Sequence, residues 1–175
     1  KNGKKNTIAD VKGVKVGHFT KIKGGDIRTG ITIIDPGVPD IFTKKLPGAI
    51  AVGNGFGKIT GLTQVEELGT IEAPIALTNT LAVGPVLRGI VDLILKENPN
   101  LSPTTTINAI VGETNDGLLN NIHKDTLTKE DVLIAYKNKK TDFEIGSVGA
   151  GTGTRCFSWK GGIGTASRII KVQNK

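Results

Sequence analysis

The feature of this sequence that most constrains its fold is a glycine-rich stretch, residues 146–168, which reads GSVGAGTGTRCFSWKGGIGTASR. Aromatic and β-branched residues lie among the glycines, whereas a flexible linker lacks such residues. Glycine is needed where a Cβ would collide with a second backbone, so we expect close packing here, with Gly164 at one such approach. The pattern predicts two strands, at 155–159 and 163–170, joined by a turn at 160–162.

Two nucleotide-binding motifs are disfavoured by their spacing and context. The Gly-x-Gly-x-Gly at 149–153 differs from the dinucleotide fingerprint Gly-x-Gly-x-x-Gly, and it leads into a predicted strand instead of a helix. The loop before Lys58 has Val52 where a phosphate-binding loop needs glycine, and Ile59 where it needs serine or threonine. The two histidines and the single cysteine have no metal-ligand spacing. We therefore expect neither a cofactor nor a metal.

Composition limits the partners of this chain. Its formal net charge of +7 comes from lysines with little aromatic interleaving, since there are only one Tyr, one Trp and five Phe. Base stacking needs aromatic side chains, so we expect no nucleic-acid partner. No apolar run approaches the ~18 residues of a membrane span, and the lysine-rich start lacks the apolar core of a signal peptide. We expect a cytoplasmic protein with no membrane partner.

The chain contains one cysteine and no methionine. Cys156 is the single cysteine, which excludes an internal disulfide and predicts a small buried residue. Methionine is absent, even at the start. The chain is therefore a processed chain, a fragment, or a sequence from which modified methionines are missing.

Apolar periodicity and turn residues predict the secondary structure. Helices are expected at 62–68, 84–97 and 129–138. Strands are expected within 7–20 and at 29–35, 48–52, 74–80 and 107–111. Thr60 or Thr63 is the expected N-cap of the first helix, and Thr128 and Asp131 form a capping box before the third. The pattern predicts one α/β domain over residues 1–175, with mostly antiparallel strands.

The motif Gly-Glu-Thr-Asn-Asp-Gly at 112–117 is the first candidate for a binding site. Glu113 follows an apolar strand directly, and a carboxylate in that position is suited to contact a charged ligand. The alternative is that Glu113 accepts backbone hydrogen bonds in the turn that follows. Asn79 ends another apolar strand, where it either lines a site or caps a turn.

Four stretches in the same order carry a resemblance to a known family: VKGVKVGHFT with RTGITII, NGFGKITGLTQVEELGTIEAPIALTNT, VGETNDGLLNNI and GAGTGTRCFSWKGGIGTASR. They resemble the self-processing aminopeptidases that include D-aminopeptidase A (L-aminopeptidase/D-Ala-esterase/amidase) and the β-peptidyl aminopeptidases. The resemblance implies a layered α-β-β-α sandwich, shared with N-terminal-nucleophile hydrolases and ornithine acetyltransferase.

The resemblance also implies how the chain works. In that family a precursor cuts itself once, and the new N-terminal Ser or Thr of the downstream chain becomes the nucleophile, because the cut frees an α-amine beside its hydroxyl. Nothing in this sequence matches that segment, so we expect the upstream chain, with no catalytic residue of its own. The implied partners are the downstream chain, further αβ units in a homo-oligomer, and small peptides, amino-acid amides or esters as substrates. Ornithine acetyltransferase-like acyl transfer and a non-catalytic binding domain remain alternatives.

The family's functional residues can be transferred to a few positions. Glu113 matches the acidic residue that holds the free amino group of the substrate. Asn115 falls where relatives carry Tyr or an apolar residue facing the substrate, so the substrate side chain is left open. The resemblance makes Asn79, Gly149 and Gly151 further candidates for the walls of the substrate pocket.

Overall fold

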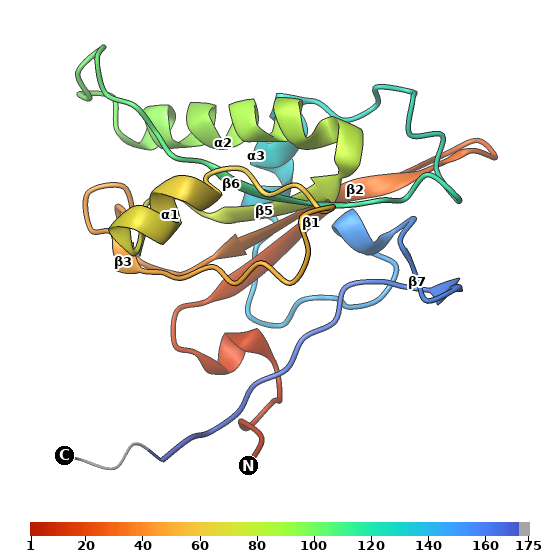
Figure 1. Ribbon diagram of the computed structural model, residues 1–175, viewed down its shortest axis with the longest axis horizontal. Helices are drawn as coiled ribbons and strands as arrows, with labels where there is room; N and C mark the ends of the chain where they lie inside the picture. The colour runs from red at the N-terminus through yellow and green to blue at the C-terminus, as the bar shows by residue number, and fades with distance from the viewer. Residues whose placement is uncertain (172–175) are drawn as a thin grey trace.

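The computed structural model describes residues 1–171 of the chain, and its centre is a four-stranded sheet (Figure 1). The strands follow the order β1-β2-β5-β6 and comprise Lys15–Lys23, Ile27–Asp35, Ile75–Asn79 and Ile110–Thr114. Strands β1 and β2, nine residues each, form an antiparallel hairpin. Strand β5 pairs with β2 in the antiparallel sense, and β6 lies parallel to β5. The expected mixed and mostly antiparallel sheet is confirmed.

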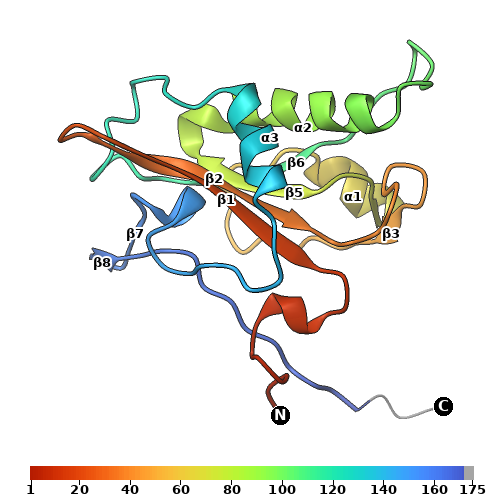
Figure 2. The same ribbon diagram turned by 180° about the vertical axis from the view of Figure 1, so that it is seen from behind.

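Two helices cover one face of this sheet. Helix α2, Val83–Glu97, packs over β5 and β6, and α3, Lys129–Lys137, packs over β1 and β2 (Figures 1 and 2). The apolar stripe predicted for the longer helix is buried against the sheet, where its residues join the strand isoleucines in one core cluster: Val86, Ile90, Ile94, Ile31 and Ile33. No helix within residues 1–171 is long and apolar enough to cross a membrane.

The ends of the helices are set partly as the sequence predicts. The capping box of α3 is present, and the Thr128 N–H donates to Asp131 Oδ2 at 2.9 Å. Helix α1, Leu62–Leu68, ends at Gly69 in the left-handed conformation, which glycine adopts without a Cβ clash. Its N-cap is Gly61, so the predicted threonine cap is wrong. The Thr60 hydroxyl instead bridges to the sheet, donating to the Ala109 carbonyl at 2.9 Å.

Short segments occupy both outer edges of the four-stranded sheet. At the β6 edge, the Thr60 N–H donates to the Val111 carbonyl at 3.0 Å, and Ile59 forms a bridge with Gly112. At the β1 edge, Val16 and Lys140 exchange two backbone hydrogen bonds of 3.1 and 3.0 Å. The strand predicted at 48–52 is wrong: the nearby strand β3 is Leu46–Pro47, which pairs with β4, Thr70–Ile71. Residues 48–52 are at least partly exposed and do not pair with a strand as part of a sheet.

The glycine-rich stretch crosses the face of the sheet opposite the helices (Figures 1 and 2). It begins with a 3₁₀ helix, η3, at Gly149–Gly151. A short hairpin follows, in which β7, Arg155–Cys156, pairs with β8, Trp159–Lys160.

This hairpin differs from the one that the sequence predicts. Its turn is Phe157–Ser158, both at positive φ, so the turn expected at 160–162 is wrong. The second strand expected at 163–170 is replaced by two isolated bridges, Ile163 with Gly146 and Arg168 with Asn2, within irregular chain. The hairpin projects from the body, and Phe157 is 94% exposed. Cys156 is also exposed, so its predicted burial is wrong.

The close backbone approach lies at Gly162 instead of Gly164. A Cβ on Gly162 would lie 2.5 Å from the Gly146 carbonyl oxygen, whereas a Cβ on Gly164 would meet no described atom within 4 Å. Because backbone atoms cannot move aside cheaply, we expect Gly162→Ala to destabilise the whole protein by about 1–3 kcal/mol. The matched control Gly164→Ala should stay within about 0.5 kcal/mol of the parent. Equal midpoints for both variants in thermal unfolding would contradict the assignment.

Candidate functional site

The polar candidates gather where the parallel strands β5 and β6 end. The two strands pair in register, with Thr78 opposite Glu113 and Asn79 opposite Thr114. Strand β6 starts and ends three residues later than the predicted strand at 107–111, so Glu113 lies within the sheet and not in the loop that follows it. A side chain on a strand is held more rigidly than one on a loop, which suits a binding group.

Glu113 is a buried carboxylate with an unused oxygen. Its side chain is 8% exposed, and its Oε1 lies 3.5 Å from the Lys58 ammonium. Its Oε2 is buried and accepts no hydrogen bond from any residue in the range 1–171. A buried, unsatisfied carboxylate oxygen is costly, and a donor group supplied by a ligand would remove that cost.

The alternative role of Glu113 in the following turn is not supported by the turn's own geometry. The Gly117 N–H donates to Asn115 Oδ1 at 2.9 Å, so the asparagine side chain closes the turn itself. Asn115 is exposed beside this turn, where it can still contact a ligand. Glu113 lies in β6 and Asn115 directly follows the end of this strand, and a shared role for them in binding stays a prediction.

Asp116 is a buried acidic residue of this turn. The sequence indicates only an Asp-Gly turn at this position. It is 1% exposed, and its Oδ1 accepts a hydrogen bond of 3.0 Å from Asn120 Nδ2. Burial raises the pKa of the Asp116 carboxyl above its ordinary value, while the nearby Thr29 hydroxyl and the hydrogen bond from Asn120 oppose the shift. No pattern in the sequence distinguishes this aspartate from an exposed turn residue.

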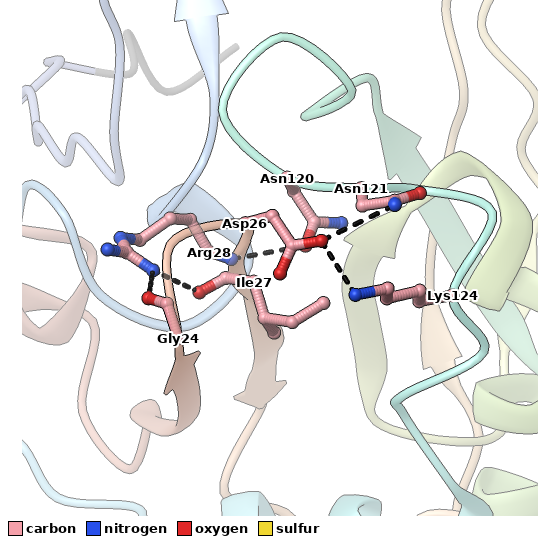
Figure 3. A network of polar contacts seen from close by, with 7 residues as sticks. All are labelled: Gly24, Asp26, Ile27, Arg28, Asn120, Asn121 and Lys124. Carbon is pink, nitrogen blue, oxygen red and sulfur yellow. Dashed lines mark hydrogen bonds and ion pairs between the residues drawn. The ribbon is translucent and has the colours of Figure 1, made fainter.

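A polar network ties the segment after Glu113 to the tip of the β1–β2 hairpin (Figure 3). Lys124 pairs with the Asp26 carboxylate at 2.7 Å, and the Asn121 N–H donates to the Asp26 carbonyl at 2.6 Å. The Arg28 N–H donates to Asn120 Oδ1 at 3.1 Å. Asn120 therefore connects the hairpin to Asp116, and the network holds the turn beside Glu113 in place.

The side chain of Asn79 is occupied by structural hydrogen bonds. Its Oδ1 accepts the Leu81 and Ala82 N–H groups at 3.0 Å, which caps the 3₁₀ helix η2, Thr80–Ala82. Its Nδ2 donates to Thr29 Oγ1 at 2.9 Å. The residue also borders a hollow of about 230 Å³ together with residues 122–127. Capping is thus present, and a part in a pocket wall stays a prediction.

The predicted glycine wall lies on the other face of the sheet. The Gly149 N–H donates to Thr20 Oγ1 at 2.8 Å, and Gly151 is packed against the chain near Ile163. Glu113 shares its side of β6 with Val111, which faces the helices, because side chains alternate along a strand. The structure therefore does not bring Gly149 and Gly151 together with Glu113.

The sequence of this chain is similar to those of known proteins. The family model described as Peptidase family S58 matches residues 6–175. The chain is 38% identical to the beta-peptidyl aminopeptidase BapA of Sphingosinicella xenopeptidilytica, over 97% of this chain and 44% of that protein. The chain therefore belongs to peptidase family S58, and the predicted resemblance is confirmed.

Two solved structures show the same architecture. The PH0078 protein from Pyrococcus horikoshii OT3 is 48% identical with a TM-score of 0.95, covering 100% of this chain and 52% of that one. The L-aminopeptidase D-Ala-esterase/amidase from Ochrobactrum anthropi is 30% identical with a TM-score of 0.88, covering 98% of this chain and 50% of that one. Its structure is described as a variant of the Ntn hydrolase fold, so the expected fold class is confirmed. The chain spans about half the length of these relatives.

Proposed function

We propose that this chain is the upstream part of an autoprocessed N-terminal-nucleophile aminopeptidase or amidase, in which Glu113 binds the free amino group of the substrate. The observation that carries the proposal is the buried Glu113 carboxylate, whose Oε2 has no partner in the described part of the chain. An ammonium group supplies both the missing donor and the opposite charge. A blocked amine lacks the charge, so the site would select free N-termini.

The remaining site residues take supporting parts in this proposal. Asn115 would lie beside the first residue of the substrate, since it is exposed next to Glu113. Asn79 would form a more distant wall of the pocket, and Gly149 and Gly151, on the other face of the sheet, would have no part in binding the amino group. The substrates would be small peptides, amino-acid amides or esters, as the names of the relatives suggest.

The nucleophile would belong to a downstream chain that begins with Ser or Thr. The freed α-amine of such a residue can accept the hydroxyl proton during attack on the substrate carbonyl, so no histidine is required. The relatives are about twice as long as this chain, which is consistent with such a partner. We further propose a cytoplasmic homo-oligomer of αβ units.

The face of the sheet opposite the helices is where the downstream chain would pack. A mainly apolar hollow of about 380 Å³ lies there, lined by Ile8, Val16, Thr32, Ile34, Leu77, Phe143 and residues 162–166. Burying such apolar surface against a second layer would stabilise the assembly. The upstream chain would then act as one domain of a layered sandwich that the downstream chain completes.

Family membership favours peptidase chemistry over the two alternatives. The relatives named above, a beta-peptidyl aminopeptidase and an L-aminopeptidase D-Ala-esterase/amidase, are aminopeptidases.

Intact-mass measurement of the product of the complete gene tests this proposal. We expect two chains whose masses sum to the precursor plus one water, with the downstream chain starting at Ser or Thr. N-terminal sequencing of the smaller and larger chains identifies the cut. A single uncut chain that is fully active would overturn the proposal.

A further inference from the structure

Lys58 is placed beside Glu113 by the backbone, although 55 residues separate the two in sequence. The Glu113 N–H donates to the Lys58 carbonyl at 3.1 Å, so the lysine lies directly across from Glu113 at the outer edge of β6. The neighbouring Thr60 N–H bonds to the Val111 carbonyl at 3.0 Å and extends the pairing. The position of Lys58 relative to the carboxylate is therefore fixed by the sheet, even though 63% of its side chain is exposed.

The Lys58 ammonium is held near the carboxylate from more than one side. It lies 3.5 Å from Glu113 Oε1, 3.5 Å from the Phe56 carbonyl oxygen, and 5.7 Å from the centroid of the Phe56 ring. These contacts engage only Oε1, and Oε2 keeps its free lone pairs. A ligand ammonium that reaches the buried Oε2 can thus bind there while Lys58 stays at Oε1.

This arrangement gives the occupied site an excess positive charge. One carboxylate would then face two ammonium groups, so any further charge on the substrate close to its amine interacts with an uncompensated cation. A second positive charge is repelled by Lys58 and a negative charge is attracted. Solvent screening limits the effect at a partly exposed lysine to about fivefold in an equilibrium constant.

We propose that Lys58 is a specificity-determining residue, whose ammonium makes the enzyme favour N-terminal residues with anionic or neutral side chains over those with cationic side chains. This inference rests on the proposed role of Glu113 as the amine-binding carboxylate. Lys58 contributes through charge and does not take part in bond breaking. It refines which free-amine substrates the site accepts.

Two pairs of p-nitroanilide substrates that differ mainly in charge test the proposal with the whole processed protein. The ornithyl and norleucyl substrates compare a cationic with a neutral side chain, and the aspartyl and asparaginyl substrates compare an anionic with a neutral one. We expect Lys58→Met to raise the ornithyl/norleucyl ratio of kcat/KM about fivefold and to lower the aspartyl/asparaginyl ratio by a similar factor. Lys58→Arg, which keeps the charge, should retain both parental ratios.

Control variants separate this inference from the function on which it rests. Lys44→Met removes the same charge in the segment before β3 and should leave both ratios unchanged. Glu113→Gln could lower kcat/KM selectively for free-amine substrates while Lys58→Met changes each ratio less than twofold. That result would overturn the role of Lys58 and leave the proposed role of Glu113 standing. If Glu113→Gln shows no such selectivity, the proposed function fails first. A uniform loss across all four substrates in Lys58→Met also overturns the inference, because it would indicate a purely structural role.

Discussion

The 175-residue chain, purified by itself, should release no p-nitroaniline from an amino-acid anilide that the whole processed protein hydrolyses. The reason is that the proposed nucleophile belongs to the downstream chain, which the isolated chain lacks. His18 Nδ1 does lie 3.0 Å from Thr32 Oγ1, but Thr32 is 1% exposed, and its hydroxyl also accepts the Ala150 N–H at 3.1 Å. Burial lowers the pKa of His18, with the Glu144 carbonyl contact opposing the shift. The Thr32 hydroxyl is therefore buried and already hydrogen-bonded, which leaves it unsuited to attack a substrate.

The measurement compares equal molar amounts of the isolated chain and the whole protein with the same substrate. Hydrolysis by the isolated chain should be at the uncatalysed rate, since removing the nucleophile of a covalent mechanism costs many orders of magnitude in rate. Adding separately prepared downstream chain provides a positive control if the two halves reassemble. Turnover by the isolated chain above about one hundredth of the activity of the whole protein would refute the prediction.

Replacing Glu113 with glutamine in the whole protein should lower kcat/KM for free-amine substrates by about 30-fold or more. Truncating one partner of a desolvated charge pair typically costs roughly 2–5 kcal/mol, and this carboxylate is 8% exposed. Glutamine keeps the shape but removes the negative charge. Substrates whose amine is acetylated should be affected far less, because they bring no cation to the site.

Glu72 provides a matched control for this substitution. It is also a buried glutamate, but both of its oxygens are occupied: Oε1 accepts the Asn108 N–H at 2.7 Å and Oε2 pairs with Lys45. Glu72→Gln should therefore reduce stability and affect both classes of substrate equally at matched folded fraction. Equal losses for both classes in Glu113→Gln would reject the amine-binding role and assign Glu113 to structure.

Local signals in the sequence predict the helices of this fold well. The spacing of Val86, Ile90 and Ile94 defines the buried stripe of α2, and Thr128 with Asp131 marks the start of α3, because both signals act within one or two turns. The β7–β8 turn is not predicted by local signals. The sequence suggests a turn at the glycines of 160–162, but Phe157 and Ser158 adopt the positive φ values of the turn. Gly162 is instead fixed by its contact with Gly146, 16 residues earlier.

The sequence predicts only some residues of the candidate site. Glu113 stands out because it follows an apolar run, and Asn115 is its near neighbour in the chain. Lys58 and Asp116 gain their positions from long-range contacts: the pairing of residues 58–60 with β6, and the burial of the turn beneath the hairpin network. Periodicity carries no information about which distant segment will occupy the edge of a strand.

The two occupied edges of the four-stranded sheet have a consequence for aggregation. An open edge presents free N–H and C=O groups that can recruit a strand from another molecule and so begin a fibril. Here residues 59–60 use hydrogen-bonding groups of β6, and Lys140 uses those of β1 at Val16. In the folded chain, the cross-β route to insoluble material is thereby obstructed at these positions of both edges.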